Sequence, residues 1–399
     1  MKNINLSFVS AGCACKANVL DWCAFTDRIV YAINNDVGII QKAERDGDFR
    51  MMGTTCLHST SISALRLISK SPEECVMLSG SSGGDVSICK FQDSSVYSKL
   101  LHKLDNFGAP IACVNGIIHS DSRCLVLCGH GNAMSFAEFN LHDSQNNELK
   151  RTSLSFGKSL VLCCDVVEFA DQLILAVGLT NGCVELLIAN KNSPTNFEQK
   201  IALKQHKNGW VRTVAFNREI EDAIDNDQQL KIRPQLLEFA NSNEQDGNIA
   251  LELNLDSVLN GHDEWVNSLR WHPTQRCLLS SSMDKNVILW RLSSDAQAVW
   301  LPWIRMGEIG GESVGFFDAI FSPNGNELLF HSFFGAFHSW TIDVESGKAS
   351  QNDFPIGGHF ASVTDLDWNS TGTYILSCAL DKTTRIFAPL KNVSIFLRY

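Results

Sequence analysis

Two segments in the C-terminal half of the chain repeat one pattern of polar residues at fixed spacing. The first runs GHDEWVNSLRWHP and then LLSSSMDKNVILW from position 261, and the second runs GHFASVTDLDWNS and then YILSCALDKTTRIF from position 358. In both, a His precedes an Asp by 22 positions, as His262 precedes Asp284 and His359 precedes Asp381. A repeat of this kind predicts an array of like structural units rather than one ordinary globular core.

Short strands and tight turns surround these polar residues. Apolar residues such as Val266, Leu269 and Trp271 recur at the spacing and length of short β-strands. The turns at 283–286 and 380–383 each place an Asp where its side chain can bond the backbone of a hairpin. Four short strands in a period of about 40 residues are typical of a propeller blade.

Weaker copies of the unit fill the rest of the chain, giving about eight repeat-like units in all. Some have lost the polar residues, since Gly83 and Thr180 stand where the Asp would be and Phe330 and Phe334 where Ser and Asp would be. The weaker copies are expected near 15–41, 56–91, 106–139, 160–189, 206–253 and 316–342. We therefore predict an all-β chain in which residues 1–399 form a single propeller. Seven blades are expected, with the eighth unit either compensating for a damaged one or left from a second ring.

The unit at 206–253 is the damaged one. After the strand predicted over Trp210–Phe216 the chain becomes acidic and polar, and residues 217–247 are expected to be a loop that replaces blade strands. The acidic run Glu219–Asp227 could recruit a basic partner, but a solvated loop is the simpler interpretation.

These residues resemble the WD-repeat family. Its tetrad is matched by His262, Ser280, Asp284 and Trp290, and again by His359, Ser377, Asp381 and Phe387. The resemblance implies a hydrogen-bonded chain across each blade, in which the His donates, the hydroxyl relays and the Asp accepts. That role is structural rather than catalytic.

A narrower resemblance covers 261–389, which is similar to the first propeller of the Elongator subunit 2 family. It rests on GHDEWVN, SSSMDKNVILW, VWLPWIRMGEIGGESVGFFDAIF, HSFFGAFHSW and ALDKTTRIFAP. The segment Trp300–Phe317, with Gly310, Gly311 and Gly315, follows no general WD rule and is expected to lie between blades. Because the family carries two propellers and this sequence stops at Tyr399, a shortened or divergent form is expected.

The resemblance also implies a function. It predicts a non-catalytic scaffold in the complex that modifies the wobble uridine of tRNA, with catalysis in another subunit and other Elongator subunits as partners. A WD-repeat adaptor of another assembly, such as a ubiquitin ligase substrate receptor, is the alternative.

Composition limits other functions. A net charge of -11 disfavours direct binding to phosphate backbones, so tRNA is expected to be reached only through the complex. The 14 cysteines form no paired zinc-site halves and are expected to be reduced, so no metal or cofactor is predicted. No window suits a membrane helix, and polar residues interrupt the N-terminal segment, so a cytoplasmic and nuclear protein is expected.

Two motifs could suggest an enzyme. The run 80–84 matches the Gly-x-Ser-x-Gly nucleophile elbow, but the residues after it alternate like a strand where an elbow needs a helix. Gly129-His130-Gly131 likewise lacks a following helix or a second ligand, and a blade turn is the better interpretation.

Four residues are candidates for a partner surface. Trp210 and Trp265 each precede a Val at the start of a unit, close to the narrow face of the predicted propeller, and Trp303 and Arg305 belong to the segment between blades. Aromatic and Arg side chains most often carry interface energy. Packing between blades would use the same residue types.

Overall fold

In the computed structural model, every element of the described part of the chain is a β-strand. The structure describes residues 4–11, 19–23, 25–26, 28–42, 49–91, 98–142, 149–169, 171–203, 209–217, 238–239, 251–252, 258–293, 299–307, 315–332, 337–352 and 359–389. Within these ranges we find no helix, and hence none that could cross a membrane.

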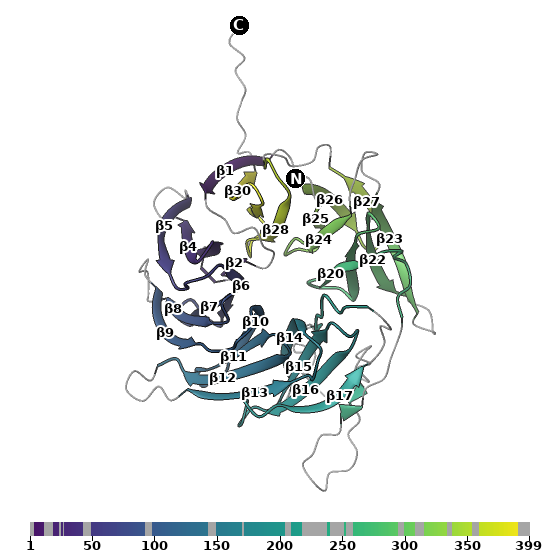
Figure 1. The fold of residues 1–399 in the computed structure, drawn as a ribbon. Coiled ribbons are helices and arrows are strands. Elements are labelled where there is room, and N and C mark those ends of the chain that lie inside the picture. Colours follow the sequence, from purple (N-terminus) through teal and green to yellow (C-terminus); the bar gives the residue numbers. More distant parts are fainter. Residues whose placement is uncertain are drawn as a thin grey trace.

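Seven four-stranded antiparallel sheets form a closed ring, which makes the chain a seven-bladed β-propeller as predicted (Figure 1). In six blades the strands follow chain order from the inside of the ring to its rim. These are β2 (Leu20–Trp22), β3 (Arg28–Ile33), β4 (Asp36–Lys42) and β5 (Phe49–Cys56); β6 (Ile62–Ser69), β7 (Cys75–Ser81), β8 (Val86–Phe91) and β9 (Ser98–Leu104); β10 (Ile111–Ile118), β11 (Arg123–His130), β12 (Ala133–Asn140) and β13 (Lys150–Ser155); β14 (Val161–Phe169), β15 (Gln172–Leu179), β16 (Val184–Asn190) and β17 (Glu198–Leu203); β20 (Val266–Trp271), β21 (Cys277–Ser282), β22 (Asn286–Leu292) and β23 (Trp300–Gly307); and β24 (Phe316–Phe321), β25 (Glu327–Ser332), β26 (Phe337–Asp343) and β27 (Lys348–Gln351).

The seventh blade closes the ring by joining distant parts of the chain. Its strands are β28 (Val363–Trp368), β29 (Ile375–Ala379), β30 (Thr383–Pro389) and, at the rim, β1 (Ile4–Ala11). β1 pairs with β30 from Ile4↔Pro389 to Ala11↔Thr383. This pairing covers the edge that β30 would otherwise expose.

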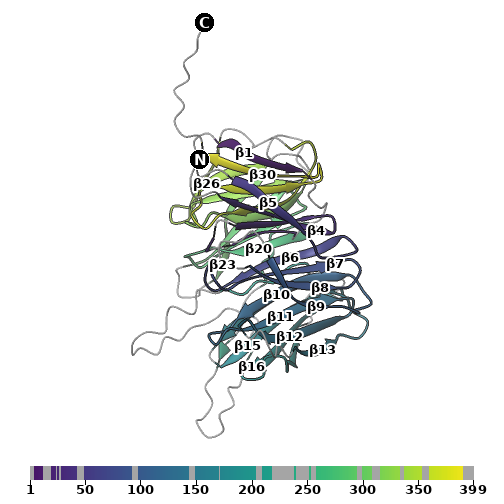
Figure 2. The same cartoon turned by 90° about the vertical axis from the view of Figure 1, so that its left-hand side faces the viewer.

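Burial follows the position of each strand in its blade. β7, β11 and β15 are buried at almost every residue, because neighbouring blades cover both of their faces. At the rim, β13 alternates between exposed and half-buried residues. Figure 2 shows β13 and other rim strands from the side of the ring. The near-continuous apolar runs of the middle strands therefore reflect sandwiching between blades.

A β-bulge recurs near the start of the inner strands. The pairing register shifts just after Ile62, Ile111, Val161, Val266, Phe316 and Val363. A bulge bends a strand and increases its twist. Six of the seven inner strands therefore share this irregularity, whereas β2 pairs with β3 without a register shift.

The damaged unit contributes an inner segment to the ring. Val211 donates its amide to the Leu179 carbonyl at 3.1 Å, just as Val161 donates to Gly131 at 2.9 Å at the start of β14. On its other side, the Trp271 indole donates to the Ala215 carbonyl at 3.2 Å. Residues 209–217 thus lie between the blades of β14 and β20, but they form no regular strand, so the strand predicted over Trp210–Phe216 is wrong.

The predicted units therefore have different outcomes. Seven of the eight became four-stranded blades, and the eighth is the damaged unit itself. Most of the loop predicted at 217–247 lies outside the described residues, but β18 (Glu238–Phe239) pairs with β19 (Leu251–Glu252), a short ladder that was not foreseen. Phe330 is buried on β25, whereas Phe334 lies outside the described residues.

The prediction that Trp300–Phe317 lies between blades is wrong for most of its described residues. Trp300–Gly307 is β23, the rim strand of its blade, and Phe316 starts β24, the inner strand of the next. β23 is part of the blade because it pairs antiparallel with β22, from Asn286↔Gly307 to Leu292↔Trp300. Gly310 and Gly311 lie outside the described residues.

Candidate functional site

The first tetrad forms a continuous hydrogen-bonded chain in the blade of β20–β23. The Trp290 indole donates to Ser280 Oγ at 2.8 Å, and Ser280 Oγ lies 2.7 Å from His262 Nε2. His262 Nδ1 lies 2.8 Å from Asp284 Oδ2. Since the carboxylate accepts at Nδ1, we assign the proton to that nitrogen and let Nε2 accept from the Ser280 hydroxyl.

Asp284 anchors the loops at this end of the blade. Besides His262 it accepts the amides of Asp263 at 3.0 Å and Asn286 at 2.9 Å. Burial by itself raises the pKa of the Asp284 carboxyl, but these hydrogen bonds outweigh burial and lower the pKa below its usual value. The carboxylate therefore ties the segment before β20 to the turn between β21 and β22.

The second tetrad lies in the closing blade and uses different donors. His359 Nδ1 is 3.0 Å from Asp381 Oδ2, and His359 Nε2 is 2.7 Å from Ser377 Oγ. The Phe387 side chain cannot donate a hydrogen bond as the Trp290 indole does, and it is buried in the core. The Thr383 hydroxyl donates to Asp381 at 2.7 Å and helps to lower the pKa of that carboxyl to about 2, against the opposing effect of burial.

A third network was missed in the sequence. In the blade of β6–β9, His58 Nδ1 lies 2.7 Å from Asp85 Oδ2, and His58 Nε2 lies 2.7 Å from Ser79 Oγ. Gly83 does occupy the position where the repeat places its Asp, but Asp85, two residues later, supplies the carboxylate. The His to Asp separation is 27 residues rather than 22, because the Asp falls two residues later and the His to Ser separation is 21 rather than 18.

Both enzyme-like motifs are hairpins. The run 80–84 joins β7 to β8, so a strand follows it rather than the helix of a nucleophile elbow. His130 ends β11 beside a two-residue turn, and its Nε2 lies 2.8 Å from Ser135 Oγ. In both cases the turn interpretation of the sequence agrees with the structure.

One face of the ring, which we call the loop face, carries the segments that lead into the inner strands and the turns between the second and third strands of the blades. Backbone hydrogen bonds link the two, as from Met283 to Trp265 and from Leu380 to Ser362. Among the described residues, the most exposed large aromatic side chains lie here: Trp210 is 66%, Trp265 67% and Phe360 92% exposed. Exposed large apolar side chains on one face are typical of binding surfaces.

Trp210 and Trp265 lie together in the structure. They line a pocket of about 360 Å³ between the inner segment 209–213 and the start of β20. Val211, Val266 and Leu269 supply apolar walls, and the Arg212 guanidinium lies 6.0 Å from the Trp265 ring centre. The damaged unit thus helps to form the pocket.

Trp303 and Arg305 lie elsewhere, on rim strand β23. The Trp303 indole donates to the Val344 carbonyl of the next blade at 2.8 Å, and Arg291 lies 5.3 Å from its ring centre. Arg305 donates to the Gly261 carbonyl at 2.9 Å. Both side chains therefore use their polar groups within the molecule, and the structure does not bring them together with Trp210 and Trp265.

Charged side chains of the inner strands converge towards the middle of the ring. Arg66 lies 3.6 Å from Asp21, and Arg270 lies 2.7 Å from Asp318 on the next blade. Carboxyl groups outnumber the cations at this level of the ring; they belong to Asp21, Asp165, Asp318, Asp365 and Asp367. Burial and the nearby Asp21 raise the pKa of Asp367 to about 7.

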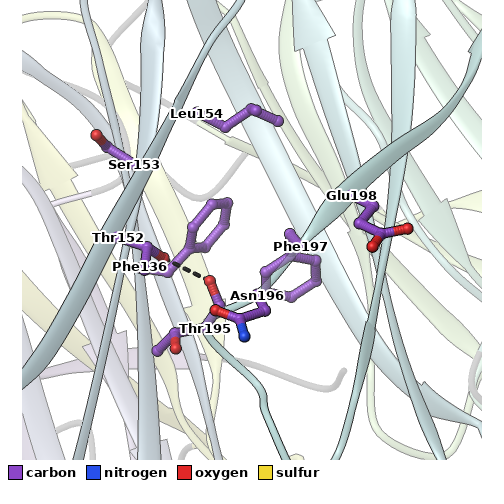
Figure 3. Close-up of a pocket in the computed structure, with 8 residues that line it drawn as sticks. All are labelled: Phe136, Thr152, Ser153, Leu154, Thr195, Asn196, Phe197 and Glu198. Carbon is purple, nitrogen blue, oxygen red and sulfur yellow. Dashed lines mark hydrogen bonds between the residues drawn. The ribbon is translucent and has the colours of Figure 1, made fainter.

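A second pocket, of about 220 Å³, lies between the rims of two blades (Figure 3). The Phe136 and Phe197 rings lie 4.6 Å apart there, and the Thr152 hydroxyl donates to the Thr195 carbonyl. Glu198 is its one titratable lining residue. Across the described ranges, no group of three or more His, Cys, Asp or Glu side chains is placed to hold a metal ion.

The fold and its blade networks define a class of protein. Residues 254–291 and 351–387 match the family model "WD domain, G-beta repeat", and they contain both predicted tetrads. The chain is therefore a seven-bladed β-propeller that carries WD repeats in these two segments.

Within that class, the chain is similar to Elongator complex protein 2. It is 29% identical to the rat protein over 79% of this chain and 42% of the relative, and 33% identical to the human protein over 60% and 32%. It is 28% identical to the Drosophila melanogaster protein over 90% of this chain and 49% of the relative. The resemblance predicted from the sequence is confirmed. The chain spans between about a third and a half of the length of these relatives.

A solved structure supports the fold alone. A chain of "Crystal Structure of Mitotic Checkpoint Complex" superimposes with a TM-score of 0.54 at 15% identity, covering 97% of this chain and 95% of that one. At this identity the likeness carries no information on partners.

Proposed function

We propose that this chain is a non-catalytic scaffold subunit of the Elongator complex, which supports modification of the wobble uridine of tRNA by another subunit. The single observation that carries this proposal is similarity to Elongator complex protein 2 along most of the chain, including 90% of it against the Drosophila relative. The His, Ser and Asp sets favour a scaffold as well, because their side chains bond one another inside blades rather than facing a pocket.

The partner surface is the loop face around the Trp210 and Trp265 pocket. Two indoles that are mostly exposed, with an Arg beside one of them, are the residue types that most often dominate interface energy. Leu160, Phe360 and Leu380 are further exposed apolar residues of the loop face. Other Elongator subunits are the partners proposed for it. The net charge of -11 favours indirect contact with tRNA, and the cytoplasm and nucleus are the proposed compartments.

Affinity purification of the tagged chain from its own cells tests the assignment. Recovery of the other Elongator subunits, including the catalytic one, is the expected result. Recovery of cullin adaptors instead would assign the chain to a ubiquitin ligase and refute the proposal.

A pair of variants tests the surface separately. Trp210→Ala with Trp265→Ala should reduce recovery of the complex at least tenfold with an unchanged melting temperature, since each indole anchor contributes about 2 kcal/mol. Leu100→Ala with Leu301→Ala is the matched control, because both leucines are exposed on rim strands away from the loop face. Equal recovery of the complex by both double variants would remove the surface from the proposal while leaving complex membership standing.

A further inference from the structure

Thiols of neighbouring blades meet at two places in the ring. Cys113 on β10 and Cys164 on β14 have their sulfurs 3.5 Å apart, and Cys23, just after β2, lies 3.7 Å from Cys75 on β7. The members of the pairs are 51 and 52 residues apart in the sequence and belong to neighbouring blades. All four thiols are free.

The sulfurs of Cys113 and Cys164 lie close to bonding distance. Their separation is about 1.5 Å longer than a disulfide bond, a difference that small side-chain rotations can close. Gly129 leaves room for the Cys113 sulfur, since a Cβ at that glycine would come within 2.7 Å of it. Asn115 and Asp165, two residues and one residue further along the same strands, bond across the blades at 3.5 Å.

The two pairs differ in access to solvent. Cys113 and Cys164 are half-buried, whereas Cys23 and Cys75 are 2% and 0% exposed. The hydrogen bond from Cys75 lowers the pKa of Cys23 to about 5, so acidity alone would favour that pair. An oxidant must first reach the sulfur, however, and reactive cysteines are typically at least partly exposed.

Within the accessible pair the two thiols have different roles. The adjacent Cys113 sulfur, and then burial, raise the pKa of Cys164 well above its usual value, so Cys164 keeps its proton. Cys163 is not a competitor for Cys113, because its sulfur points to the Val211 carbonyl at 3.5 Å and burial raises its pKa to about 12.

We propose that Cys113 and Cys164 form a modification site, a dithiol that a peroxide oxidises to a disulfide between neighbouring blades. The Cys113 thiolate attacks one peroxide oxygen, the O–O bond breaks, and hydroxide leaves and takes up a proton to form water, giving a sulfenic acid. The Cys164 sulfur then attacks the Cys113 sulfur, the S–O bond breaks, and the hydroxyl leaves with the Cys164 proton as water. Two thiols lose two electrons, and one hydrogen peroxide becomes two waters.

Peptide mapping after treatment of the folded chain with stoichiometric hydrogen peroxide tests the site. We expect one peptide pair linked through Cys113 and Cys164, reversed by dithiothreitol, and no link between Cys23 and Cys75. In Cys164→Ser the reaction should stop at the sulfenic acid, so that dimedone labels Cys113 at least tenfold more than in the wild type. Cys163→Ser is the matched control and should retain the linked pair.

Two results would overturn the proposal. One is a folded wild-type chain in which Cys113 and Cys164 both remain open to alkylation after peroxide treatment. The other is linkage of Cys113 to Cys163, which would place the resolving thiol on the wrong residue. Because mapping of the wild type decides the first result, the test stands even if a serine variant fails to fold.

Discussion

Three histidines connect the loops of their blades. His58, His262 and His359 each bond a carboxylate through Nδ1 and a serine through Nε2, and all three side chains are at most 5% exposed. A buried polar chain of this kind is stabilising only while every member has its partner. A single substitution in such a chain should therefore lower the free energy of unfolding more than a substitution at an exposed neighbouring residue.

Asp284→Ala tests this at one residue. The change leaves His262 and two backbone amides without their acceptor, so we expect the free energy of unfolding to fall by ~1–3 kcal/mol. Asp263→Ala is the control, since Asp263 is exposed and takes part through its backbone amide, which alanine keeps. Urea unfolding that shows equal losses for the two variants would refute the structural role of Asp284.

Asp381 gives the network a pH dependence. Its folded pKa of about 2 lies below the usual value of 3.8, so its contribution is present above about pH 4 and is lost as the pH falls through 2. We expect the difference in unfolding free energy between the wild type and Asp381→Asn to shrink steadily from pH 5 to pH 2. A difference that stays constant over that range would mean that the charge of the Asp381 carboxylate adds nothing to the stability of the fold.

At the scale of elements, the sequence predicted blades where strand pattern and turn chemistry agree. The units with His262 and His359 could be predicted from the spacing of their polar residues alone. The network of His58 was hidden because its carboxylate, Asp85, falls two residues after the expected position. The hairpin between β7 and β8 has the same pairing as the one between β21 and β22. The segment from His58 to Ser79 is also three residues longer than the segment from His262 to Ser280, so the fixed spacing of the repeat did not reveal the network.

Rim strands were harder to predict than inner ones. β23 carries Pro302 and two aromatic residues, Trp300 and Trp303, and its pairing with β22 was not predicted from the sequence. The pocket at Trp210 depends on contact between the damaged unit and the next blade. That contact is set by how the ring closes, which local sequence does not contain.

Trp303 gives a prediction at this scale. Because its indole bonds Val344 and packs against Gly347 of the next blade, Trp303→Ala with Arg305→Ala should lower the free energy of unfolding by about 2 kcal/mol. Leu301→Ala, an exposed position on the same strand, should change it by less than about 0.5 kcal/mol. Unchanged melting of the double variant, combined with lost capture of partners, would restore the earlier interpretation of these residues as an interface.

At the scale of the whole molecule, closing the ring concentrates charge at its middle. Arg66 and Arg270, on different blades, are both influenced by Asp367 on a third. Asp365 and Asp21 are near enough to Asp367 to add to the crowding of carboxyl groups. A propeller with more acids than bases at this level should therefore lose stability as those acids ionise.

Asp367→Asn tests this consequence of closure. The unfolded carboxyl releases its proton near the usual 3.8 and the folded one near 7, so the wild type loses stability as the pH rises between these values. Asparagine keeps an oxygen to accept the Trp368 amide without carrying charge. The variant should therefore gain stability relative to the wild type from pH 5 to pH 8, and a gain that does not depend on pH would contradict this account.

The most direct test of the scaffold account measures modified wobble uridine in tRNA from cells that lack this chain. Mass spectrometry of tRNA nucleosides should show loss of the modification, with recovery when the wild-type chain is restored. The Trp210→Ala, Trp265→Ala chain should restore less of the modification, because the proposed partner surface is removed while the propeller is expected to stay folded. Normal levels of modified uridine in cells without the chain would contradict the central claim.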